Sequence, residues 1–352
     1  MSQTPTPSLA ATPPRSYASV QWRKAAGLLC ALLLIAGSLL LDFTIGPAGL
    51  SLAQLAAALQ RQGDAMHVLV VWDIRLPMAL LAVTVGMALG LAGAELQTVL
   101  GNPLASPFTL GLSAAAALGA ALGMLLQDHL PAYGGSWLVP TAAFAFAMSV
   151  ALLLDLTGRL ARLSSTGIIM FGIACDFSCH ALLSLVQFAA TTESLQNIVF
   201  WTMGSLSHAS WQAVGLLTLT LLLSLPWALT DSWRLTALRM GEERASSFGV
   251  NVAALRLRAL FRVSLLAGTA VAMAGTIGFI GLVAPHIARS LFGEDHRFFL
   301  PASMLVGGII LSCSSLVSRL LLPGIIIPVG IVTALVGIPF FMVIVCRNGR
   351  SN

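Results

Sequence analysis

Four neighbouring side chains within an apolar stretch have types that could bind a metal ion or move a proton. Asp176 and His180 stand four residues apart, with Cys175 and Cys179 beside them. A helix brings residues i and i+4 to one face, so the carboxylate and the imidazole are predicted to meet. A metal site needs ligands that converge and a supporting shell. The four residues therefore favour an internal hydrogen-bonded pair, with the sulfurs as packing, and we predict no metal here.

Glu95 is the second acid within an apolar stretch. An ionisable residue at such a place is a functional candidate by default. It could pair with Gln97 or with a neighbouring helix, and the sequence leaves both open. Glu95 or Asp176 could also relay protons, and a proton-coupled secondary transporter is the alternative hypothesis that follows.

Nucleotide hydrolysis is excluded by the lysine count. The chain has 18 Lys and Arg residues, and Lys24 is the only lysine. A P-loop requires a lysine that reaches the β- and γ-phosphates, in the pattern G-x-x-x-x-G-K-[ST]. If the work of this protein uses ATP, another chain must hydrolyse it.

The composition predicts an all-α integral membrane protein. Of 352 residues, 57% are hydrophobic and only 9% are charged, against about 25% charged in soluble domains. Residues 1–20 are predicted to form a disordered tail, residues 21–347 a domain of about ten transmembrane helices, and residues 348–352 a second tail. The apolar runs fall near 25–41, 76–100, 108–127, 137–155, 166–189, 212–230, 257–276, 277–292, 299–319 and 330–346.

Basic residues predict the orientation of these helices. With the N-terminus in the cytoplasm and ten alternating helices, fifteen Lys and Arg residues face inward and three face outward. The outward ones are Arg61, Arg75 and Arg319. Both termini are then predicted to be cytoplasmic.

The longest polar interruption is residues 231–258, which also lie on the predicted cytoplasmic side, and residues 234–258 form its candidate functional segment. Within it, Ala245, Phe248 and Val252 have the spacing of one helical face. A loop of this length in a compact bundle is usually functional. A short helix here could dock into a soluble partner.

This segment and five others resemble one family, that of the iron–siderophore, haem and vitamin B12 permeases of ABC importers (FecCD-type). Met240-Gly-Glu-Glu-Arg-Ala245, followed by Phe248-Gly-Val250, resembles the family's coupling segment G-E-x-x-A-x-x-L-G-V. The other matches, in family order, are Ile74-Arg-Leu-Pro77, Ala92-Gly93 through Pro107, Phe200-Trp201 through Trp211, Gly278 through Arg289, and Pro328 through Phe341. Together they cover roughly residues 25–347.

The resemblance implies a type II ABC importer permease fold and a transport subunit that is not an enzyme. The implied partners are a second permease copy, two ATP-binding subunits that use ATP and Mg, an extracytoplasmic substrate-binding protein and membrane lipid, with no nucleic acid and no cofactor bound by this chain. The implied place is the cytoplasmic (inner) membrane of a bacterium. Ferric siderophore is the expected cargo, and haem and cobalamin remain open.

The resemblance also implies roles for particular residues. The residues expected to contact the ATPase are Gly241, Glu242, Glu243, Arg244, Ala245, Phe248 and Gly249. Docking of the binding protein falls to Arg75 and Arg319. The translocation path is expected to include Asp176, His180, Met203, Gly204, Ser205, Pro328 and Gly330.

Three of the departures from the family pattern remove a charge. Met78 stands where the family has a second arginine, Ser315 replaces the usual acid four residues before Arg319, and Ile326 replaces the acid before Pro-Val-Gly. Fewer charges are therefore expected on the outer surface than the family pattern has.

Overall fold

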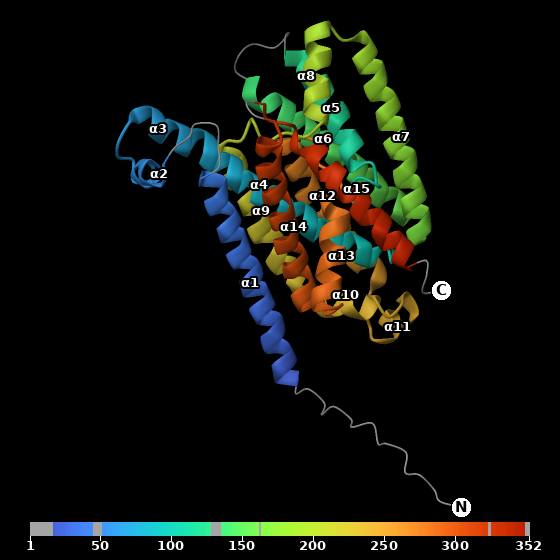
Figure 1. The fold of residues 1–352 in the computed structure, drawn as a ribbon. Coiled ribbons are helices and arrows are strands. Elements are labelled where there is room, and N and C mark those ends of the chain that lie inside the picture. The colour runs from blue at the N-terminus through green and yellow to red at the C-terminus, as the bar shows by residue number, and fades with distance from the viewer. Residues whose placement is uncertain (1–16, 45–50, 128–134, 162, 323–324, 349–352) are drawn as a thin grey trace, which may run out of the picture.

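The computed structural model describes residues 17–44, 51–127, 135–161, 163–322 and 325–348. Throughout these ranges the regular secondary structure is helical, and Figure 1 shows most of it gathered in one bundle. The predicted all-α class is confirmed.

Each of the ten predicted apolar runs coincides with one helix. Seven helices are long and apolar enough to cross a membrane, while α5, α13 and the apolar part of α15 are shorter. The ten are α1 (Tyr17–Thr44), α4 (Leu76–Val99), α5 (Leu112–Gln127), α6 (Gly135–Leu160), α7 (Ser165–Ala189), α9 (Trp211–Thr230), α12 (Val252–Ala274), α13 (Ile280–Phe292), α14 (His296–Leu320) and α15 (Val329–Asn348).

In the described ranges, six further short helices lie between the long ones, and the sequence patterns did not reveal most of them. They are α2 (Leu52–Leu59), α3 (Ala65–Leu69), the π-helix η1 (Val70–Arg75), α8 (Thr192–Thr202), α10 (Ser232–Leu238) and α11 (Glu242–Ser247). In Figure 1, α2, α3 and α8 lie toward one end of the bundle, and α10 and α11 lie at the other. We call the end that carries α10 and α11 the coupling end.

One predicted boundary is wrong, and one predicted division between helices is confirmed. Helix α1 begins at Tyr17, so residues 17–20 of the predicted tail are helical, because nothing in this stretch breaks a helix; residues 1–16 lie outside the described part. Helices α12 and α13 are separated without a polar loop. Gly275 ends α12 at a φ of +71°, and Phe279 precedes α13 at a φ of +67°. The predicted division between the runs 257–276 and 277–292 is confirmed, and the backbone conformation makes the break.

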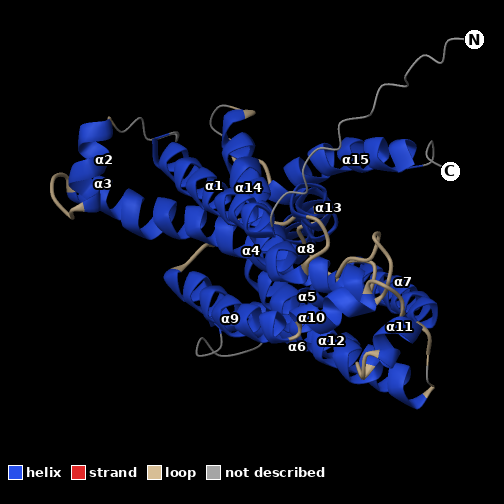
Figure 2. Ribbon diagram, turned by 90° about the horizontal axis from the view of Figure 1, so that it is seen from below, coloured by secondary structure: helices blue, strands red, loops and turns tan. Residues whose placement is uncertain are grey.

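Helix α4 occupies the centre of the bundle, beside α14 and α1 (Figure 2). It is buried along nearly its whole length. Small residues allow its backbone to approach α14 closely: a Cβ on Gly307 would overlap the carbonyl group of Gly86, and a Cβ on Gly90 would overlap that of Ser303. Glycine-lined contacts of this kind are how membrane helices pack tightly without a hydrophobic driving force.

Replacing Gly307 by alanine is expected to destabilise the permease by about 1–3 kcal/mol, because the new methyl group overlaps the Gly86 backbone. The thermal midpoint of the purified protein in detergent measures this. Gly215→Ala in α9 is the matched control, since nothing lies within 4 Å of the added methyl group. Equal midpoints for the two variants would contradict the close packing of α4 on α14.

Candidate functional site

Helix α11 forms an exposed projection at the coupling end. Gly241, with a φ of +109°, precedes it, and Gly249, with a φ of +81°, follows it. The helix closes with backbone hydrogen bonds from Gly249 N to Ser246 O (2.9 Å) and from Val250 N to Ala245 O (3.0 Å), the pattern of a Schellman motif. Ala245 and Val250 are buried beneath it.

The predicted single apolar face of this segment is wrong. Because Gly249 ends the helix, Phe248 points outward and is 61% exposed, while Val252 belongs to α12. The exposed surface therefore includes Gly241, Glu242, Glu243, Arg244, Ser246, Ser247, Phe248 and Gly249, with Ala245 buried beneath them.

Glu242 connects this projection to the bundle. Its carboxylate forms an ion pair with Arg256 of α12. The same guanidinium group donates to the backbone carbonyl of Val99 at the end of α4 (3.3 Å) and to the hydroxyl of Ser165 at the start of α7 (3.0 Å). One arginine thus joins α11 to three long helices.

The strongest polar attachment of α4 is a buried ionic triad. Arg262 of α12 donates from Nε to both carboxylate oxygens of Glu95 (3.0 and 2.9 Å) and from Nη1 to Asp231 (3.1 Å). All three side chains are fully buried. Asp231 lies between α9 and α10, so the triad links α4 to the segment that leads into α11.

Two further series of hydrogen bonds and ion pairs begin at the same stretch of α4. Gln97 accepts a hydrogen bond from Arg289, which pairs with Glu294; Glu294 in turn pairs with Arg239 (2.8 Å). Hydrogen bonding and charge from Arg239 lower the pKa of Glu294, which keeps this loop carboxylate ionised.

The second series of hydrogen bonds includes a histidine. Thr98 hydrogen-bonds one ring nitrogen of His296 (2.9 Å), and the other ring nitrogen bonds Thr236 of α10 (3.0 Å). Residues 95–99 of α4, which we call the α4 hub, are therefore attached by four separate routes to the segment 231–256.

At the opposite end of the bundle, the two predicted docking arginines are buried in the described chain. Arg319 forms an ion pair with Asp42 of α1, and its side chain is 6% exposed. It also donates to the backbone carbonyl and the hydroxyl of Ser315 (3.2 and 3.3 Å). Asp42, from another helix, thus supplies the carboxylate that the family pattern places at position 315. Arg75 ends η1 and is 5% exposed.

Part of the predicted path converges where three helices are interrupted. Ser205 N donates to Ala274 O (2.9 Å), and Gly330 N donates to Gly204 O (3.3 Å). A Cβ on Gly330 would overlap the carbonyl group of Met203. Irregular backbone within a membrane is tolerated only where it is covered by protein or lines a water-filled space. Here Met203, Gly204 and Ser205 contact the start of α15, directly after Pro328.

Asp176 and His180 lie elsewhere, on α7, which packs against α5 and α6. As predicted, the two side chains share one face of the helix, but 3.9 Å between the carboxylate oxygen and the imidazole nitrogen is too long for a hydrogen bond. Both side chains are also partly exposed, Asp176 at 32% and His180 at 59%, so the predicted internal hydrogen-bonded pair is wrong. Across the described ranges, no group of three or more His, Cys, Asp and Glu side chains is arranged to hold a metal ion.

Sequence reasoning missed Asp42, Asp231 and Arg262 as members of buried ion pairs. Arg262 had been counted among the inward flanking charges, although it lies inside an apolar run. An arginine and a glutamate in two separate apolar runs are a signal that they pair, because neither charge is stable alone in the membrane.

Comparisons with known proteins agree with the motifs. The model of the FecCD transport family matches residues 32–347. The chain is 37% identical to the Fe(3+)-citrate import system permease protein YfmE of Bacillus subtilis, over 80% of this chain and 84% of that protein. It is 35% identical to the vitamin B12 permease BtuC of Vibrio vulnificus (80% and 83%) and 34% identical to the hemin permease HmuU of Yersinia pestis (80% and 85%).

A solved structure shares the fold. An inward-facing metal-chelate type ABC transporter superposes with a TM-score of 0.81 at 32% identity, covering 92% of this chain and 99% of that chain. The helix arrangement and the site at the coupling end therefore belong to a transport component rather than to an enzyme. The chain is a member of the FecCD transport family, the membrane permeases of type II ABC importers.

Proposed function

We propose that this permease moves ferric siderophores into the cytoplasm across the cytoplasmic membrane of a bacterium, by alternating access. The observation that carries the mechanism is the attachment of α11 to the α4 hub. Glu242 is 58% exposed and yet bonded, through Arg256, to the end of the central helix. A force that a docked partner applies to α11 would therefore act directly on α4.

The source of that force is a pair of ATP-binding subunits, which hold ATP and Mg and dock on the exposed surface of α11. A second copy of the permease completes the path, and a substrate-binding protein delivers the cargo at the opposite end. In Figure 1, α1 begins and α15 ends toward the coupling end, which supports an even number of crossings and two cytoplasmic termini.

A metal chelate is favoured as cargo because one relative is named for Fe(3+)-citrate and the structural neighbour is of the metal-chelate type. Haem and cobalamin are the competing cargoes, since other relatives are named for them. The proton-coupled alternative is disfavoured at Glu95, because Arg262 bonds both of its oxygens and the side chain is fully buried. For that alternative, Asp176 remains the candidate proton relay.

Cells that lack this chain should lose the uptake of labelled ferric siderophore and keep the uptake of haem and of cobalamin. Restoring the gene should restore the siderophore uptake. Loss of cobalamin uptake alone, with iron uptake unchanged, would overturn the assignment of the cargo.

Glu242→Arg should lower ATP-driven uptake by about tenfold, because the new charge repels Arg256 and disturbs the surface that the ATPase contacts. The amount of permease in the membrane should not change. In the charge-swap variant Glu242→Arg/Arg256→Glu, partial recovery would indicate that the internal pair contributes to coupling. Normal uptake by the single variant would contradict the docking assignment.

Arg319→Met should destabilise the permease by about 3–5 kcal/mol, because it leaves the carboxylate of Asp42 buried without a partner. Asp42→Asn/Arg319→Met should recover most of the thermal midpoint. If the positive charge of Arg319 also attracts the binding protein, its association rate stays reduced in the stable double variant. Full recovery of that rate would argue against a docking role for Arg319.

A further inference from the structure

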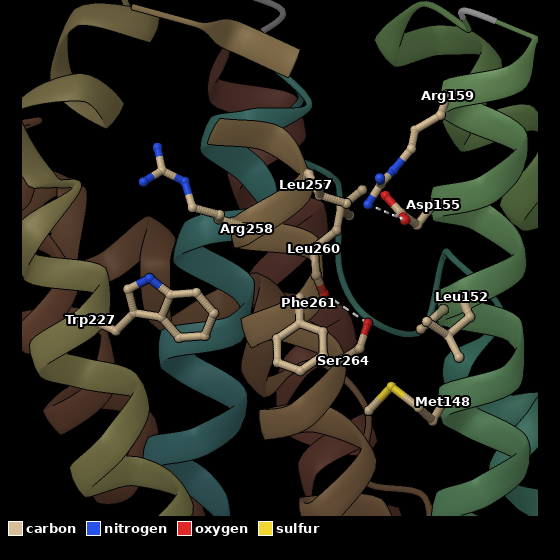
Figure 3. Close-up of a pocket in the computed structure, with 11 residues that line it drawn as sticks. Met148, Leu152, Asp155, Arg159, Trp227, Leu257, Arg258, Leu260, Phe261 and Ser264 are labelled. Atoms are coloured by element: carbon tan, nitrogen blue, oxygen red, sulfur yellow. Dashed lines mark hydrogen bonds and ion pairs between the residues drawn. The ribbon is translucent and has the colours of Figure 1, made fainter. Parts of the chain in front are cut away.

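A groove of about 370 Å³ lies between α6, α9 and α12 (Figure 3). Its wall is mostly apolar and includes Met148, Leu152, Trp227, Leu260 and Phe261. None of the routes that connect α11 to α4 uses these five side chains.

The groove opens on the outer surface of the bundle. Leu152 is 55% exposed, Phe261 46% and Trp227 36%, and the neighbouring outward residues Leu222 and Leu223 of α9 are more than 60% exposed. In a membrane protein such an exposed apolar surface faces the hydrocarbon of the bilayer, so an acyl chain has access to the groove.

Two arginines lie on the lining of this groove. Arg159 of α6 is neutralised by Asp155, one turn away (2.9 Å). Arg258 of α12 lies on the other side, near Trp227, as Figure 3 shows. Its guanidinium group reaches Asp231 at 3.2 Å, and its side chain is 37% exposed.

The charge on Arg258 is only partly balanced. Arg234 and Arg258 both form an ion pair with one oxygen of Asp231. Arg262 donates to the other oxygen of Asp231 and to both oxygens of Glu95. This cluster contains three arginines and two carboxylates. Arg262 is fully buried, so the excess positive charge is left on the half-exposed Arg234 and Arg258, and Arg258 lines the groove.

We propose that the groove is a binding site for an anionic phospholipid. The phosphate binds the guanidinium group of Arg258, and an acyl chain lies along Leu152, Phe261 and Trp227. Basic pockets between membrane helices are a recurring way to bind anionic headgroups, and tryptophan is favoured at the level of the headgroups. The site requires only that the chain spans a membrane, whereas its placement in the inner leaflet rests on the proposed orientation.

The position of the site links lipid charge to coupling. A phosphate at Arg258 competes with Asp231 for that guanidinium group, and Asp231 also holds Arg262 of the buried triad. An anionic lipid therefore relieves the crowding of three arginines around one carboxylate, beside the α4 hub.

The test uses the whole importer, purified with its ATP-binding partner, stripped of lipid and then incubated with phosphatidylglycerol or phosphatidylcholine. Native mass spectrometry counts the bound lipid. We expect phosphatidylglycerol to be retained in preference to phosphatidylcholine, and Arg258→Gln to reduce its occupancy by about fivefold. The matched control is Arg23→Gln, an exposed arginine near the start of α1, which should leave occupancy unchanged.

A second variant leaves the ionic cluster intact. Leu152→Trp fills the groove from its lipid side and should also displace phosphatidylglycerol, with an unchanged thermal midpoint. Equal retention of the two lipids, or full retention by both groove variants, would overturn the proposal. Dissociation of the permease pair in either variant would also overturn it, and would instead identify the groove as a contact with the second copy.

Discussion

The buried bond between Arg262 and Glu95 is the constraint around which the coupling end is organised. An arginine and a glutamate without water are stable only together, and removing one leaves the other charge unpaired at high cost. Because Asp231 completes the triad, the end of α4, the middle of α12 and the start of α10 are held at fixed distances from one another. The neighbouring bonds of Gln97, Thr98 and the Val99 carbonyl extend this rigid attachment to α13, α14 and α7.

Close packing connects the α4 hub to the rest of the bundle. Helix α4 touches α14 through Gly86, Gly90 and Gly307, with almost no side chain between the two backbones. Densely packed elements transmit displacement rather than absorb it, because few voids are available. In the proposed mechanism, a displacement that begins at α11 passes through the α4 hub to the centre of the bundle. Around Gly204 and Gly275 the helices are interrupted, and the start of α15 at Gly330 packs against these interruptions.

The two ends of the permease use charge differently. At the coupling end, arginines outnumber the acids around Asp231, and the excess lines a lipid-facing groove. At the other end, Arg319 and Asp42 neutralise each other below the surface and tie α1 to α14. The acid that the family pattern places near Arg319 is thus present, but it comes from a different helix.

The sequence by itself determined the class, the ten apolar helices, the polar segment that became α10 and α11, and the family, because hydropathy and motif spacing are local properties. It did not determine the partner of Glu95, since Arg262 lies 167 residues away and only folding brings the two together. Nor did it show that Arg319 is buried against Asp42, or that Gly249 ends α11 so that Phe248 points outward. Local spacing predicts which residues share a helix; which charges neutralise each other is decided by helix packing, where an unpaired charge is too costly to remain.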